Sequence, residues 1–163
     1  MHAPEKQARP AAKSGFGHLA IGKKGEDLAV DFLKTRRMTI LERNWRPAAK
    51  GALSAGLRGL ELDIVAREGD TLVFVEVKTR TTRENARAGG TAGAGDGGPF
   101  RPLDAYSPAK RAKLRKAVAL YLGEKRAWGQ PCRLDLVCVE VSAAGLVRRV
   151  ELYQDALSGG EIF

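Results

Sequence analysis

The sequence predicts an α/β domain in which a mixed β-sheet is flanked by helices, in the order α-β-β-β-α-β-β. Three observations lead to this fold class. Residues 60–66 and 71–78 form two strand patterns on either side of a Gly-containing turn. Residues 134–141 are almost continuously apolar, as expected for a central strand covered on both faces. Apolar side chains recur at helical spacing over residues 25–37 and again after Ser107.

The first half of the chain is expected to begin with a flexible basic tail over residues 1–20. One domain is expected over residues 21–163, a length that suffices for a single core. Its first helix covers residues 25–37, and a first strand covers 38–46. The Gly-, Ala- and Ser-rich stretch at 50–59 is interpreted as a loop.

The second half is punctuated by clear loop and cap signals. Residues 83–99 are predicted to be a flexible Gly-rich loop, because they hold six glycines and no apolar period. Ser107 and Pro108 open a second helix, since Ser is a preferred N-cap and Pro is favoured at the first helical position. A last strand at 146–153 is expected to lie at a sheet edge.

Composition favours an acidic partner and a cytoplasmic location. The chain has 28 Lys and Arg against 19 Asp and Glu, a net charge of +9. That surplus suits nucleic acid or an anionic membrane surface. No apolar run approaches the roughly 20 residues that span a bilayer, and the N-terminus lacks a secretory pattern. Cys132 and Cys138 are interpreted as buried, reduced thiols.

Basic charge is concentrated at the start of the second helix. Cations at a helix N-terminus oppose the helix dipole, so a bound polyanion explains them better than a solvated face does, although a solvated face is the commoner explanation. The run comprises Lys110, Arg111, Lys113, Arg115 and Lys116.

The hairpin predicts a cluster of charges on one face. A loop of two or four residues around residues 68–69 would place Asp63 opposite Phe74, and Glu61 opposite Glu76. With that parity, Asp63 and Glu76 point the same way, and Lys78 points with them.

Two carboxylates on one face attract a hard cation. At ~4 Å they repel by roughly 4 kcal/mol at an effective dielectric near 20. Oxygen ligands without a nearby His or Cys favour Mg²⁺ or Mn²⁺. The alternative is that this face is solvated and that Glu76 and Lys78 are ordinary surface charges.

Glu26 is a further candidate. On a helical wheel it lies inside the apolar arc of residues 25–37, and a carboxylate facing a core needs a partner or a metal. The alternative is a first-turn acid that complements the helix dipole.

The sequence around these residues resembles that of the small bacterial YraN-like proteins. They are an uncharacterised family related to Holliday-junction resolvases and to the PD-(D/E)XK nuclease superfamily. The resemblance implies a restriction-endonuclease-like core. The matching segments are Gly22–Glu26, Asn44–Arg46, Glu61–Ala66, Phe74–Arg80, Pro108–Leu114 and Arg133–Leu136.

The resemblance also implies roles for individual residues. Asp63 and Glu76 would ligate Mg²⁺ or Mn²⁺, with the backbone carbonyl of Val77 as a further ligand. Lys78 would be the catalytic lysine, and Glu26 the acid that a helix contributes in the resolvase-like branch.

The implied activity is metal-dependent endonucleolytic hydrolysis of phosphodiester bonds in DNA, in particular branched DNA, and the resemblance raises a homodimer as an expectation. The alternative is a non-catalytic nucleic-acid-binding module that keeps the nuclease fold. No membrane partner is expected. The residues expected to contact nucleic acid are Arg46, Arg80, Lys110, Arg111, Lys113 and Arg115.

Overall fold

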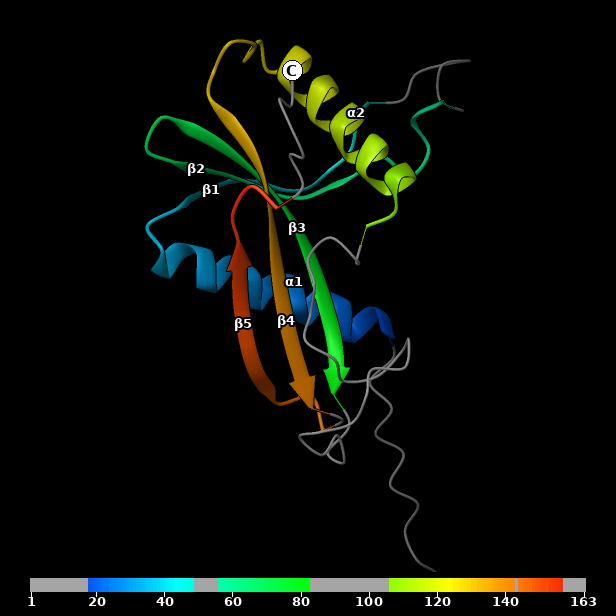
Figure 1. Cartoon of the computed structure of the whole chain (residues 1–163), viewed down its shortest axis with the longest axis vertical. Coiled ribbons are helices and arrows are strands. Elements are labelled where there is room, and N and C mark those ends of the chain that lie inside the picture. The colour runs from blue at the N-terminus through cyan, green and yellow to red at the C-terminus, as the bar shows by residue number, and fades with distance from the viewer. Residues whose placement is uncertain (1–17, 49–55, 83–105, 143, 157–163) are drawn as a thin grey trace, which may run out of the picture.

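A computed structural model describes residues 18–48, 56–82, 106–142 and 144–156. It contains one five-stranded sheet with the strand order β1-β2-β3-β4-β5 and two helices (Figure 1). The strands are β1 (Thr39–Trp45), β2 (Leu62–Glu68), β3 (Thr71–Thr82), β4 (Cys132–Ser142) and β5 (Val147–Tyr153); the helices are α1 (His18–Thr35) and α2 (Pro108–Glu124). The predicted fold class is confirmed, and the arrangement is compatible with a restriction-endonuclease-like core.

The sheet is mixed because of one long connection. β3 and β4 are parallel, whereas the other neighbouring strands are antiparallel. Parallel neighbours require a crossover, and here that crossover contains α2. β2 and β3 are instead joined directly at Gly69, whose φ of 55° suits a tight turn.

Each face of the sheet carries its own apolar core. On one face, α1 packs Ala29 and Leu33 against Val73 and Val137. On the other face, α2 packs a second set of side chains against the sheet, and Figure 1 shows the two helices at different heights along it. The second core includes Leu114, Val118, Tyr121, Phe74, Leu134 and Leu136. Residues 134–139 of β4 are all buried, which confirms the central strand predicted from its apolar run.

The structure corrects the predicted bounds of three elements. α1 begins at His18, before the predicted start at residue 25 and inside the stretch assigned to the tail. The small, polar and proline-containing composition of residues 1–20 predicted a tail, but the helix begins before residue 20 and continues through Gly22 and Gly25. β2 covers Leu62–Glu68 in place of 60–66, and β3 continues to Thr82. β2 is therefore displaced by two residues with its length unchanged, whereas β3 is longer than predicted at its polar end.

The second half follows the prediction closely. Ser107 caps α2, and its side-chain oxygen accepts a hydrogen bond from the Lys110 N–H at 3.3 Å. β5 lies at the sheet edge. Both cysteines are free; Cys138 is buried, whereas Cys132 is only half-buried, which corrects the prediction for it.

The predicted tail up to residue 17 and the Gly-rich loop at 83–99 lie outside the described residues. Neither helix in the described part of the chain is long and apolar enough to cross a bilayer.

Candidate active site

The β2–β3 register differs from the predicted one by two residues. Glu68 pairs with Thr71 and Ile64 with Val75, so Phe74 faces Val65 and the placement of Asp63 opposite Phe74 is wrong. The reason is the turn, which contains only residues 69–70 and leaves Glu68 in the strand. Continuing the register one step beyond Ile64 brings Asp63 opposite Glu76, where Glu61 was expected.

The predicted side-chain direction survives this shift, because a slip of two residues does not change the face. Val65 and Phe74 belong to the core beneath α2, so Asp63 and Glu76, two residues further along their strands, point to the same side. Lys78 pairs with Cys138, another member of that core, and shares the face. Lys78 is exposed, whereas Glu76 is only 7% exposed.

Each carboxylate has a different protein partner. The backbone N–H of Val77 donates a hydrogen bond to Asp63 Oδ2 at 2.8 Å, so β3 itself orients the Asp63 carboxylate. Lys110 Nζ lies 2.7 Å from Glu76 Oε1 and forms an ion pair with it. Lys110, in the first turn of α2, therefore brings a cation into contact with Glu76. Asp63 and Glu76 together are called the acid pair below.

The electrostatics of the pair reflect burial and mutual repulsion. Burial and the charge of Glu76 raise the pKa of Asp63 to about 7, although the Val77 N–H and Lys110 act in the opposite direction. Burial likewise raises the pKa of Glu76, against the effects of Lys110 and Lys78. At neutral pH the pair is thus poised to take up a cation or a proton.

Tyr106 is a site neighbour that sequence reasoning missed. It precedes the α2 cap, is 4% exposed, and its hydroxyl finds no hydrogen-bond partner among the described residues. Burial raises its pKa first, and the negative charge of Glu76 and Asp63 raises it further. The hydroxyl is therefore a donor close to the acid pair. An aromatic residue next to a helix cap was the one local signal for it.

Gly25 explains how α1 reaches the site. A Cβ built on Gly25 would lie 1.9 Å from Thr79 Oγ1, so only glycine permits this close approach between α1 and β3. The contact anchors α1 on β3 and sets the position of the next residue, Glu26.

Glu26 does not point into the core, which corrects the helical-wheel prediction. Its Oε2 accepts a hydrogen bond from Asn44 Nδ2 at 3.1 Å and lies 4.0 Å from Arg43 Nη2. Because α1 begins at His18, Glu26 is not in the first turn either. Its charge still reaches Asp63, whose pKa it raises as the weakest of the causes.

The backbone of Asn44 explains this contact. Asn44 has a φ of 51°, a left-handed conformation that asparagine tolerates better than most residues. Its amide is thereby available to Glu26 at the end of β1. Sequence reasoning matched Asn44 only as part of a motif; an asparagine within a strand pattern is the signal that could have indicated special backbone geometry.

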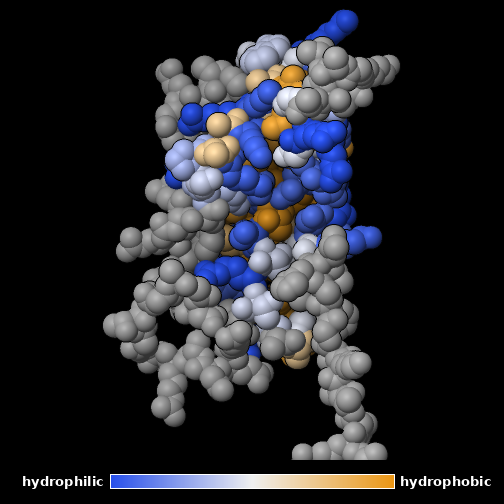
Figure 2. Space-filling view, turned by 90° about the vertical axis from the view of Figure 1, so that its right-hand side faces the viewer, coloured by the Kyte–Doolittle hydropathy of each residue, from blue (hydrophilic) through white to orange (hydrophobic). Residues whose placement is uncertain are grey.

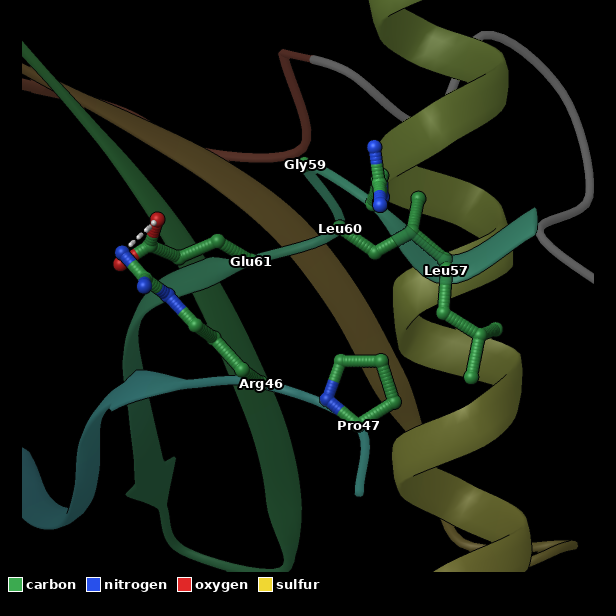
Figure 3. A pocket seen from close by; sticks show the side chains of 7 residues that line it. Arg46, Pro47, Leu57, Gly59, Leu60 and Glu61 are labelled. Carbon is green, nitrogen blue, oxygen red and sulfur yellow. Dashed lines mark hydrogen bonds and ion pairs between the residues drawn. The ribbon is translucent and has the colours of Figure 1, made fainter. Parts of the chain in front are cut away.

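A pocket lies next to the start of β2. It has a volume of about 500 Å³ and sits where the end of β1 and the segment before β2 approach α2 (Figure 3). Arg46 Nη2 pairs with Glu61 Oε2 at 2.9 Å along its wall, and Glu61 is two residues from Asp63. The lining residues are Arg46, Pro47, Leu57, Arg58, Gly59, Leu60 and Glu61.

The other predicted nucleic-acid contacts lie mainly on α2. Lys113 is exposed, and Arg111 and Arg115 are half-buried on the same helix. Arg80 is half-buried on β3. Figure 2 views the molecule from the side on which both helices begin, and hydrophilic side chains lie there on both sides of a narrow line of apolar ones. Among these cations, Lys110 is the one that the structure places in contact with the acid pair, through Glu76.

The donors present suit a hard divalent cation with few protein ligands. Within the described ranges no group of three or more His, Cys, Asp or Glu side chains is placed to share a metal ion. The candidate side-chain ligands are the two facing carboxylates, Asp63 and Glu76. Mg²⁺ is commonly held by one or two carboxylates while it keeps several waters, so this oxygen-only pair fits it. A structural zinc site does not fit, because structural zinc is held by four protein ligands, mostly Cys and His.

Residues 25–139 match the model of the family described as "Uncharacterised protein family UPF0102". The chain belongs to this family. The predicted resemblance to YraN-like proteins is thereby confirmed. The matched range contains Glu26, the acid pair, Lys78 and Lys110.

Several UPF0102 proteins are similar to this chain along most of its length. A UPF0102 protein of Oleidesulfovibrio alaskensis is 40% identical over 136 residues, which are 83% of this chain and 55% of that protein. The chain therefore spans little more than half of that relative. One from Nitratidesulfovibrio vulgaris is 39% identical over 120 residues, 74% of this chain and 72% of the relative. One from Geobacter metallireducens is 38% identical over 123 residues, 76% of this chain and 81% of the relative.

Proposed function

We propose that this UPF0102 protein is a divalent-metal-dependent nuclease that hydrolyses phosphodiester bonds in DNA. The observation that carries the proposal is the pair of facing carboxylates, Asp63 and Glu76, with Lys78 on the same face. Burying two like charges side by side is costly unless a cation is shared between them. A pair of this kind beside a basic helix start is typical of a site that acts on phosphates.

We assign the metal ligands as follows. Asp63 and Glu76 would hold Mg²⁺ or Mn²⁺, with the Val77 carbonyl as the further ligand that the family resemblance implies. The ion supplies a Lewis acid that withdraws electron density from a phosphate oxygen. The Val77 N–H keeps Asp63 Oδ2 in a fixed orientation throughout.

We assign Lys78 the role of stabilising charge on the reacting phosphate. It is exposed, it shares the face of Glu76, and its charge lowers the pKa of Glu76. A water oxygen would attack phosphorus and lose a proton to solvent, while the bond to the leaving sugar oxygen breaks and that oxygen takes up a proton from solvent. The Lys78 ammonium would stabilise the negative charge that builds on the phosphate oxygens in this step.

The α2 start supports DNA as the polyanion. Lys113 and Arg111 lie next to Lys110 at a helix N-terminus, where backbone N–H groups and the helix dipole also favour phosphate. Arg46 is 71% exposed beside the pocket and adds a further cation. Branched DNA is proposed on the resemblance to junction resolvases alone.

A second function, non-catalytic nucleic-acid binding, is favoured by a specific contact. Lys110 already pairs with Glu76, so the protein's own cation occupies the carboxylate oxygen that a metal ion would need as a ligand. A binding module would retain this ion pair and use the basic helix without cutting DNA.

A cleavage assay separates the two functions. Four-way junctions, flaps and linear duplexes are incubated with Mg²⁺ or Mn²⁺, with EDTA as the blank. We expect metal-dependent products that fall by about 100-fold or more in Glu76→Gln and in Lys78→Met, consistent with loss of a charge-stabilising group. Asp31→Asn, an exposed change on α1, is the matched control and should cut as wild type does.

Absence of cleavage on every substrate would contradict the nuclease proposal. If binding then persists, weakens steeply between about 50 and 200 mM salt, and is unaffected by Asp63→Asn, the binding module is supported.

A further inference from the structure

Lys110 is held at two points by different parts of the structure. Its backbone N–H donates to the Ser107 side chain at 3.3 Å, which fixes the start of α2. Its ammonium lies 2.7 Å from Glu76 Oε1 on β3. The Lys110 side chain is 46% exposed and that of Glu76 is 9% exposed, so the lysine reaches from solvent onto a buried acid.

We propose that Lys110 is an exchangeable counter-cation, which neutralises Glu76 in the metal-free protein and moves to a DNA phosphate when a divalent ion binds. This role rests on the proposed function, because it assumes that the acid pair holds a metal. It assigns Lys110 a place in the reaction cycle that differs from that of the other α2 cations.

The ion pair between Lys110 and Glu76 neutralises only one of the two buried carboxylates by direct contact. Two carboxylates face one another, whereas one ammonium contacts only Glu76 and acts on Asp63 through its charge at longer range. A divalent ion between the two acids would carry twice the charge of Lys110 and contact both. It would also repel the ammonium, because like charges this close cannot share one carboxylate without cost.

Lysine is suited to such an exchange. Its ammonium is a compact charge on a flexible four-carbon stem, whereas an arginine would hold the carboxylate through a rigid two-point contact. Released from Glu76, the ammonium would remain at the N-terminus of α2, beside Arg111 and Lys113. There it could pair with a phosphodiester oxygen of DNA bound at the same helix start.

The first test measures metal binding and needs no activity. Mn²⁺ is titrated calorimetrically into the full chain at pH 8.5, above the pKa of about 7 for Asp63, so that proton competition is small. We expect Lys110→Met to bind Mn²⁺ about 10-fold more tightly than wild type, because it lacks the competing cation. Lys113→Met removes the same charge from an exposed position one turn away and should stay within about twofold of wild type.

A second variant keeps the test decisive if Lys110→Met folds poorly. Lys110→Arg retains the charge and holds Glu76 more rigidly, so Mn²⁺ should bind to it no more tightly than to wild type. Equal Mn²⁺ affinity in Lys110→Met and wild type would overturn the exchange. Tighter binding in Lys110→Met and Lys113→Met alike would also overturn it, since general charge would then be the cause.

The second test measures the coupling between metal and DNA. DNA affinity is compared with and without Ca²⁺, at constant ionic strength. In wild type we expect Ca²⁺ to strengthen DNA binding by about 10-fold, because it frees Lys110 for phosphate; Lys110→Met should lose most of that gain. An equal gain in both proteins would overturn the proposal. Failure of every protein to bind Mn²⁺ would instead overturn the metal site itself, and with it the proposed function.

Discussion

Two acidic sites lie on the same sheet, and their carboxylates are satisfied in different ways. Asp135 on β4 is completely buried, and Arg133 Nε donates to both of its oxygens at 3.0 Å. The backbone N–H of Asp155 donates to Oδ1 at 2.8 Å. Asp63 and Glu76 instead face each other and depend on one backbone N–H and one lysine.

Burial raises the carboxyl pKa at both sites, so pKa alone does not distinguish them. The difference lies in the donors. Both oxygens of Asp135 accept from Arg133 Nε, one of them also accepts from the backbone, and Arg133 Nη2 in turn pairs with Glu68 at 2.6 Å, which makes a closed structural unit. The Asp63–Glu76 pair has a half-exposed lysine as its only cation in contact among the described residues. A buried acid with fixed partners supports the fold, whereas one with a movable partner leaves room for a ligand.

The largest expected effect is at Asp135. In Asp135→Asn the side-chain oxygen can still accept from the Asp155 N–H, but the negative charge beside Arg133 is lost, which leaves that half-buried guanidinium with Glu68 as its remaining ion-pair partner among the described residues. We expect the free energy of unfolding to fall by about 3 kcal/mol. Urea denaturation of the full chain measures this. The exposed change Asp31→Asn should stay within about 0.5 kcal/mol of wild type; a similarly small effect at Asp135 would remove the distinction between the sites.

The opposite sign is expected at Asp63. In Asp63→Asn the side-chain oxygen can still accept from Val77, while the repulsion of Glu76 is lost. We expect the free energy of unfolding to rise by about 1–2 kcal/mol at pH 8. The raised pKa fixes the pH window. Folding favours protonated Asp63, so wild-type stability falls as the pH rises from about 4 to about 7.

Asn cannot titrate, so the advantage of Asp63→Asn should appear across that window and vanish near pH 4. Urea denaturation at pH 4, 6 and 8 measures the difference. An advantage of equal size at all three pH values would show that the charge of Asp63 is not its cause.

The smallest effect is expected at Tyr106. Its buried hydroxyl lacks a partner within the described residues, so Tyr106→Phe should raise the free energy of unfolding by about 1 kcal/mol. Tyr121 is a matched control, because its hydroxyl donates to Glu42 at 3.2 Å, and Tyr121→Phe should lower stability by about 1 kcal/mol. Thermal melting compares the two variants, and a shift in the same direction for both would contradict this.

Sequence reasoning reached the face of the acid pair but not its register. Parity needs only an even loop length, whereas register depends on where the turn falls. The turn lies at residues 69–70, one residue later than expected, which shifts the pairing by two. Local signals sufficed for the α2 cap at Ser107. The environment of Glu26 and the Lys110–Glu76 contact could not be predicted, because each joins separate elements whose packing no local pattern encodes.

The topology of the sheet also orders these contacts in time. Asp63 and Glu76 meet within a hairpin that is closed by a two-residue turn, whereas Lys110 arrives on the long crossover between β3 and β4. Short hairpins close in microseconds, and pairings distant in sequence form later. We therefore expect the two facing negative charges to meet before their counter-cation arrives. Their repulsion would then add an electrostatic contribution to the folding barrier, separate from the role of the acid pair in the finished site.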